Sequence, residues 1–379
     1  MIFKLALGTC VSSTFLMTAC VVLPIAVRKS TIRYLWKIFV ISFSVLIYFN
    51  EPSFSTDLWR HYYCMDEIRN HIMPTMYGAE VGFIAFLWLL TIIAKNNILP
   101  SVVFLITGLM IDKIYQEYNS QYKNNIAIKS RTLIVYYVMA LSGLNIFYIV
   151  SGIRSALICS IFVWTYVKFY KTNRKWYYII SFLLGTVHIM SFMLLILVVV
   201  NEMIKKVEKE GRILVIFLIA FVGFRVGIQS GVIAFLASIL PGSLGNLVYM
   251  KVISYGVVVN SQEILPLSLV INNVVIIFVL ITSLYFTRKQ DSLVFLLFFI
   301  SIFGGLLETV EGRLVQATVL LMMPVLQIND TRMKRGVNYI YSIIIYFACL
   351  FSCFFSFYSL CAHTILNGVN YRGILSDMF

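Results

Sequence analysis

The sequence predicts an all-α polytopic membrane protein, and three observations lead to that class: sparse charge, long apolar runs and the placement of basic residues. Of its 379 residues, 60% are hydrophobic and 12% are charged, whereas a soluble domain carries about 25% charged residues. A helix that crosses a bilayer needs roughly 20 apolar residues, and it satisfies its own backbone polar groups there. We therefore expect a single transmembrane domain over 1–379, with about 11–13 transmembrane segments that include short or re-entrant helices.

The apolar runs give the spans in order. The first, at about 5–27, has the form of a signal peptide, but we interpret it as the first span of a polytopic protein. The later spans are predicted at 34–50, 78–94, 98–111, 132–150, 153–167, 176–200, 213–229, 267–287, 292–307, 313–328 and 338–362.

Two of these regions do not fit simple crossings. The run 176–200 has basic residues beyond both ends and is too short for two full spans, so we expect a bend at Gly185 to His188 between two short helices. Two crossings within 78–131 would return the chain to the side of 51–77, although lysines place 112–131 on the opposite side. Either one of the two apolar segments, 78–94 or 98–111, is re-entrant, or 112–131 lies on the extracytoplasmic side.

The net charge of +14 is concentrated in short connections. In a membrane protein this indicates cytoplasmic loops, and no nucleic-acid partner is expected. Five basic connections should face the cytoplasm: 28–37, 168–175, 205–212, 287–290 and 331–335. The segments 51–77 and 230–266 are then predicted to be extracytoplasmic loops.

The seven cysteines lie mostly inside apolar runs. Neither a CxxC pair nor a Cys/His spacing typical of zinc sites occurs in the sequence. We therefore expect neither a disulfide framework nor a zinc site. No cofactor is expected for this chain.

A permanent cation stands in an otherwise apolar stretch, because Arg154 is the only charged residue between Arg131 and Lys168. The stretch is too long for one span and fits two, so the chain should turn near 143–153 and Arg154 should open the second helix. This places Arg154 at the outer surface, against the positive-inside trend. The alternative is that its side chain only reaches toward lipid headgroups.

Two later segments repeat this placement. Arg313 opens a span after an outer turn that contains Glu308 and Glu311, and His188 lies at the expected outer bend of 176–200. Ionisable groups at membrane depth are costly and usually face a water-filled cavity. The structural alternatives are an ion pair between Arg313 and a nearby glutamate, and a packing role for His188.

The loop 51–77 brings further polar side chains to the same side. They are Asp57, Arg60, His61, Tyr62 and Tyr63. Asp57 has an alternative role as the cap of a following helix, and Arg225 is a further candidate within 213–229. Together these segments predict one aqueous cavity on the outer side, lined by Arg154, Arg313 and His188.

Two arginines at a membrane surface suit a phosphate ligand. A guanidinium offers a rigid fork of donors that matches phosphate oxygens, and it stays protonated. A lipid diphosphate would present its phosphates at this depth while its polyprenyl tail remains in the bilayer.

Three motifs resemble those of the EpsG-like, Wzy-type polysaccharide polymerases. "STDLWRHYY" (55–63) resembles the Gly-Thr-Asp-Tyr…Tyr element after the second span of that family. The segment 151–197 resembles its Arg-Gln-x-x-Ala span, basic turn and His-x-Ser-x-x helix, and "EGRLVQATVLLMMPVL" (311–326) resembles its late Arg-bearing span. Ser155 and Leu58 stand where the family usually has Gln and Tyr.

The resemblance implies a polymerase of lipid-linked oligosaccharide repeat units on the outer side of the bacterial cytoplasmic (inner) membrane. The donor would be a growing glycan on undecaprenyl diphosphate, and the acceptor a single lipid-linked repeat. The implied fold is that of C-type glycosyltransferases, which need no metal or nucleotide sugar. A chain-length regulator protein is a further partner of this class.

The hypothesis assigns each candidate residue a role. Arg154 and Arg313 bind the diphosphate, because cations aimed at the leaving group stabilise the transition state. His188 is a candidate base for the acceptor hydroxyl, with Asp57 or Glu311 as alternatives. The substrate-binding candidates also include Arg60, Tyr62, Glu308, Arg225 and, within 230–266, Tyr249.

Two rival functions remain open at this point. One is an O-antigen ligase or another glycosyltransferase that uses a polyprenyl-phosphate sugar, although 230–266 is short for the outer domain of a ligase. The other is a flippase or transporter of lipid-linked oligosaccharides, in which the arginines would bind without catalysis. Transporters often contain inverted repeats, and no repeat is evident in the sequence.

Overall fold

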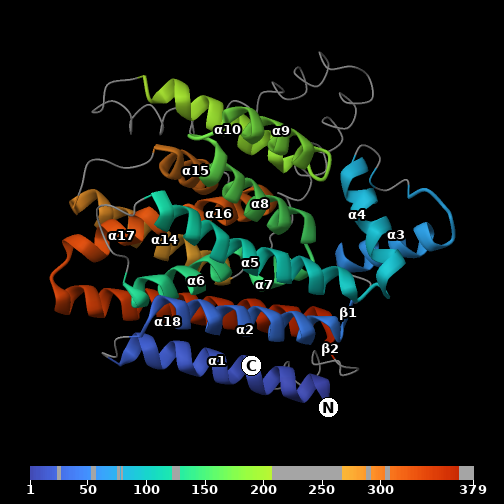
Figure 1. The fold of residues 1–379 in the computed structure, drawn as a ribbon, viewed down its shortest axis with the longest axis horizontal. Coiled ribbons are helices and arrows are strands. Elements are labelled where there is room, and N and C mark those ends of the chain that lie inside the picture. The colour runs from blue at the N-terminus through green and yellow to red at the C-terminus, as the bar shows by residue number, and fades with distance from the viewer. Residues whose placement is uncertain are drawn as a thin grey trace.

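The computed structural model describes residues 1–23, 27–52, 57–74, 77, 80–121, 129–206, 267–286, 292–303 and 308–366. This part is mostly helical, which confirms the all-α prediction, and most helices run along one axis as a bundle (Figure 1). The helices of the first half are α1 (Ile2–Val22), α2 (Lys29–Tyr48), α3 (Asp57–Arg69), α4 (Val81–Ile93), α5 (Ile98–Gln121), α6 (Ser130–Leu144), α7 (Ile146–Val150), α8 (Ile153–Phe169), α9 (Arg174–Gly185) and α10 (Met190–Ile204).

The second half contributes α14 (Leu267–Phe286), α15 (Ser292–Phe303), α16 (Glu308–Leu320), α17 (Met323–Arg332) and α18 (Arg335–His363). A short antiparallel ribbon of β1 (Asn50–Pro52) and β2 (Thr364–Leu366) joins the ends of α2 and α18. The predicted span 213–229, the predicted loop 230–266 and the connection 287–290 lie outside the described residues.

Within the described ranges, four helices are long and apolar enough to cross a membrane: α1, α2, α5 and α18. Large apolar side chains also point outward from the bundle, among them Phe15 of α1 and Phe354 of α18. Outward apolar faces are what lipid contact requires of a spanning helix. These long apolar helices support the predicted membrane protein.

Within the described residues, three of the five predicted basic connections meet at one end of the bundle, which we call the basic end. Lys129, before α6, forms an ion pair with Asp330 of α17 at 2.8 Å. Arg174, at the start of α9, lies 3.8 Å from Glu202 near the end of α10. The α1–α2, α8–α9 and α17–α18 connections thus share one end, as the charge distribution predicted (Figure 1).

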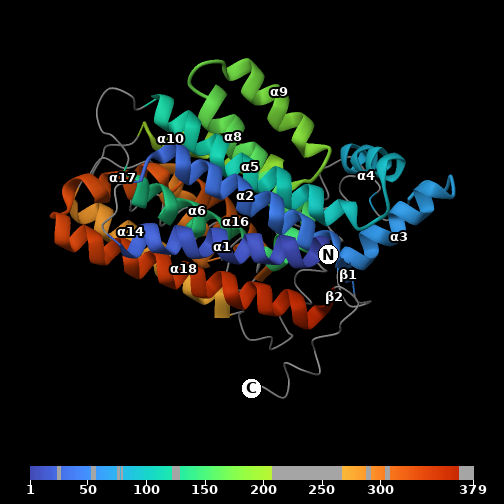
Figure 2. The same ribbon diagram turned by 60° about the horizontal axis from the view of Figure 1, so that its bottom comes forward.

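The opposite end, which we call the site end, carries α3, α4 and the β-ribbon (Figure 2). Both ends of α4 are held there, because Gly82 N donates to Thr186 O at 3.0 Å and Arg69 Nη2 donates to Ala94 O at 2.7 Å. Thirteen residues of helix are only about 20 Å long. A helix of this length held at one end favours the re-entrant alternative for 78–94 over a full crossing, and α5 then starts at the site end.

Three breaks interrupt the apolar runs. Residues 186–189 separate α9 from α10, which confirms the predicted bend. The run 313–328 is not one span, because α16 ends at Leu320 and α17 starts at Met323. The run 132–150 also breaks, at Asn145, whose φ of 59° ends α6 in a conformation that asparagine tolerates.

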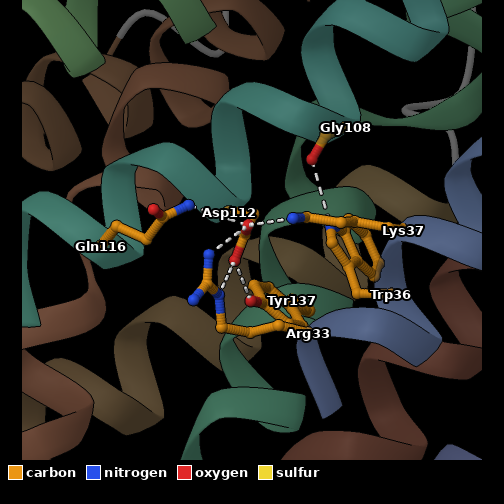
Figure 3. A network of polar contacts seen from close by, with 7 residues as sticks. All are labelled: Arg33, Trp36, Lys37, Gly108, Asp112, Gln116 and Tyr137. Carbon is orange, nitrogen blue, oxygen red and sulfur yellow. Dashed lines mark hydrogen bonds and ion pairs between the residues drawn. The ribbon is translucent and has the colours of Figure 1, made fainter. Parts of the chain in front are cut away.

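A buried carboxylate joins α2, α5 and α6 (Figure 3). Asp112 accepts hydrogen bonds from Arg33 Nε at 2.9 Å and from Tyr137 Oη at 2.6 Å. Trp36 stacks on the Tyr137 ring, with centroids 4.7 Å apart, and donates to Gly108 O at 2.9 Å. A buried charge requires such partners, so this network fixes α2, α5 and α6 against one another.

Candidate functional site

A cavity of about 80 Å³ opens at the site end. It gathers side chains from α3, from the α7–α8 and α9–α10 turns and from α16. The lining residues are Asp57, His61, Tyr148, Gly152, Arg154, Ser155, His188, Arg313 and Gln316. All four predicted catalytic residues, from distant parts of the sequence, therefore line one cavity.

The turn before α8 sets the position of Arg154. Asn145 Oδ1 accepts from Phe147 N at 3.0 Å and so starts the short helix α7. At Gly152, which lines the cavity, an added Cβ would lie 3.2 Å from Tyr148 O. The chain turns tightly at this point, and Arg154 falls in the first turn of α8, as predicted.

Arg154 is held on three sides. Its Nη1 forms an ion pair with Glu80, the residue before α4, and the two side chains are only 17% and 15% exposed. The guanidinium carbon lies 4.8 Å from the ring centroid of Tyr77 and 5.5 Å from that of Phe83. Such cation–π contacts stabilise a desolvated guanidinium. Arg154 is thus a fixed cavity group, and the alternative of a side chain directed at lipid headgroups does not describe it.

His61 also lines the cavity and contacts Tyr77. Its Nδ1 shares a hydrogen bond with the Tyr77 hydroxyl, and the two rings stack with centroids 5.5 Å apart. His61 lies in α3, outside the spanning helices, and it is buried. Burial lowers its pKa well below the ordinary value of 6.5, and the charges of Arg154 and Arg60 lower it further. His61 is therefore neutral at pH 7.

His188 lies at the bend between α9 and α10 and is buried. Its Nδ1 accepts a hydrogen bond from Met190 N at 3.0 Å. Because a backbone N–H only donates, Nδ1 must carry the lone pair, so the neutral ring is protonated at Nε2. The start of α10 also disfavours an added positive charge. This geometry makes His188 a donor through Nε2 and argues against the predicted role as base.

Arg313 and Gln316 lie three residues apart and so share one face of α16. Both line the cavity. The Cys159 thiol of α8 donates a hydrogen bond to the backbone carbonyl of Arg313 in α16, with 3.6 Å between sulfur and oxygen. This contact joins the two helices that carry Arg154 and Arg313. The side chains of Glu308 and Glu311 lie outside the described part, so the predicted ion pair with Arg313 is not described either.

Asp57 is the first residue of α3, and its carboxylate pairs with Arg60 one turn later. The Asp57 side chain is 43% exposed. Among the described lining residues it is the only carboxylate. Asp57 therefore supplies a carboxylate to the cavity that Arg154 and Arg313 also line.

Two predicted substrate-binding residues of α3 do not line the described cavity. Asp57 and His61 are four residues apart and share the face that lines it. Tyr62 packs against the hydrophobic core instead, and Arg60 is exposed beside Asp57. The role of these two residues in substrate binding therefore stays a prediction. Arg225 and Tyr249 lie outside the described residues.

The structure adds residues that the sequence did not single out. Glu80 is an isolated acid before an apolar run, and Gln316 is a neutral residue inside another. His61 was visible only as part of a polar loop. Within the described ranges, no cluster of three or more His, Cys, Asp or Glu side chains could hold a metal ion.

Comparison with known proteins yields no significant match: neither a family model, nor a curated protein, nor a solved structure is similar to this chain.

Proposed function

We propose that the chain is a metal-independent glycosyltransferase that polymerises lipid-linked oligosaccharide repeats on the outer side of the bacterial cytoplasmic membrane. One observation carries this proposal: Arg154 and Arg313, from α8 and α16, line one cavity. The elements that line this cavity, among them α3 and the α9–α10 turn, lie at the end of the bundle opposite the described basic connections (Figure 1). By the positive-inside rule the cavity then faces outward. A C-type glycosyltransferase fold belongs to the same proposal.

In the proposed reaction, the acceptor hydroxyl attacks the anomeric carbon of the donor glycan. The bond from that carbon to the diphosphate oxygen breaks, and its electron pair leaves with undecaprenyl diphosphate. Arg154 and Arg313 stabilise the charge that develops on the leaving group. Preorganisation supports this role, since Glu80 and two aromatic rings already hold Arg154 in place.

The proton of the acceptor hydroxyl goes to the carboxylate of Asp57 in this mechanism. Asp57 is a better candidate than His188, because the hydrogen bond from Met190 N occupies Nδ1 and leaves the proton on Nε2. The Nε2–H of His188 instead donates to an oxygen of the diphosphate. His61, neutral and bonded to Tyr77, forms the wall beside Arg154.

The test uses purified protein in vesicles that contain an undecaprenyl-diphosphate-linked repeat. The proposal expects polymer from the wild type and little from Arg313→Lys, which keeps the charge but loses the fork. Arg332→Lys, an exposed change at the basic end, is the matched control and should polymerise normally. Movement of the repeat across the membrane without new glycosidic bonds would instead indicate the flippase alternative.

A further inference from the structure

Gln316 is a buried polar residue in the cavity wall that the proposed mechanism does not use. Its side chain is 1% exposed, and it lies one helical turn beyond Arg313. Nε2 donates to Leu144 O at 3.1 Å. Leu144 ends α6, where a carbonyl has no partner within its own helix.

That hydrogen bond fixes the orientation of the amide. An exchange of the oxygen and nitrogen of Gln316 would bring Oε1 against the carbonyl oxygen of Leu144, and two acceptors repel. Oε1 is therefore the amide atom turned away from Leu144 O, and it is buried without a hydrogen-bond partner among the described residues. Native proteins pair nearly all such atoms, so an acceptor left open in a ligand cavity indicates a donor on the ligand.

The neighbouring groups limit which donor this can be. Arg313 on the same face of α16 is assigned to the diphosphate, and three residues along a helix advance only about 4.5 Å. In a glycosyl diphosphate the substituent nearest to the phosphate-bearing C1 is the one on C2. On the basis of the proposed function, we infer that Gln316 Oε1 accepts a hydrogen bond from the C2 hydroxyl or C2 acetamido N–H of the donor sugar.

Binding of synthetic glycosyl diphosphates to the purified protein in detergent tests this inference. The probes are farnesyl diphosphate-glucose, its 2-deoxyglucose counterpart and sugar-free farnesyl diphosphate, with dissociation constants from calorimetry. For the wild type we expect the glucose compound to bind about tenfold more tightly than the 2-deoxy compound, since one buried hydrogen bond is at stake. In Gln316→Met the preference should disappear, while the 2-deoxy compound keeps its affinity.

Gln327→Met is the matched control, because Gln327 is also buried but lies on α17, away from the cavity lining. It should retain the tenfold preference. If Gln316→Met does not fold, Gln316→Asn, which draws the amide back by one methylene, should reduce the preference in the same direction.

The outcomes separate this inference from the function on which it rests. Equal binding of the two sugars by the wild type, or an unchanged preference in Gln316→Met, would overturn the role of Gln316 alone. Failure of even sugar-free farnesyl diphosphate to bind would overturn both, because the arginines would then hold no diphosphate.

Discussion

Glu80 and Arg154 form an ion pair that joins α4 to α8 across the rim of the cavity. Glu80 directly precedes α4, and the backbone of Gly82 is bonded to Thr186 in the bend that carries His188. At Gly82 there is no room for a Cβ, which would collide with Thr186 Oγ1. The position of α4 is thus coupled to two groups of the proposed site.

Replacement Glu80→Gln should lower both stability and activity. It leaves a mostly buried guanidinium without its countercharge, at a cost of about 1–3 kcal/mol in the free energy of unfolding. Thermal unfolding in detergent and polymer yield measure the two effects. Glu202→Gln at the basic end, which also removes an ion-paired acid, should leave polymer yield unchanged. If Glu80→Gln changed neither the unfolding temperature nor the polymer yield, the ion pair would not be what positions Arg154.

Asp57→Asn should remove the proposed base. General base catalysis contributes about 100- to 10,000-fold, and we expect a rate loss in that range without a change in protein level. Asp66→Asn, on the same helix but exposed and paired with Arg69, is the control. Initial rates of repeat coupling give the comparison, and a nearly normal rate for Asp57→Asn would exclude this carboxylate.

The tautomer of His188 leads to a prediction about pH. In His188→Asn the side-chain oxygen can still accept from Met190 N, but the donor of the imidazole is lost, so the rate should fall about 100-fold. The shape of the pH–rate profile should stay the same, because the base in the proposed mechanism is Asp57 and not His188. Loss of an ascending limb near pH 6.5 in His188→Asn would restore the histidine as base.

His61 makes stability depend on pH. Its pKa is lowered in the folded protein, so below about pH 6.5 the unfolded chain takes up a proton that the folded chain does not. Stability should be level above that pH and fall progressively as the pH drops to 5. Thermal unfolding between pH 5 and 8 tests this, and His61→Gln should flatten the acid side of the curve. His71→Gln, at an exposed position, should retain the wild-type slope.

The sequence identified Arg154, His188 and Arg313 because a charged or titratable residue is conspicuous in an apolar run. It could not separate Asp57 from Tyr62 in their polar loop, since the choice depends on which face of α3 turns to the cavity. Gln316 carries no charge. Its importance follows only from an orphan carbonyl at Leu144, on a different helix.

The fold was predictable to a similar degree. Apolar runs located most helices, and a bend in 176–200 followed from basic residues beyond both of its ends. The run 78–94 is as apolar as a true span, and only tertiary contacts of Gly82 and Ala94 show that α4 stays at one end. The predicted span 98–111 stopped before Asp112, whereas α5 continues through it, because Arg33 and Tyr137 from other helices pair with its carboxylate.

A structure of the protein with undecaprenyl diphosphate bound, determined by electron cryomicroscopy, would test the central claim most directly. We predict density for the diphosphate in the cavity at the site end, within hydrogen-bond distance of the guanidinium groups of both Arg154 and Arg313. Density for the diphosphate at the basic end, or in the cavity but in contact with neither arginine, would contradict the account.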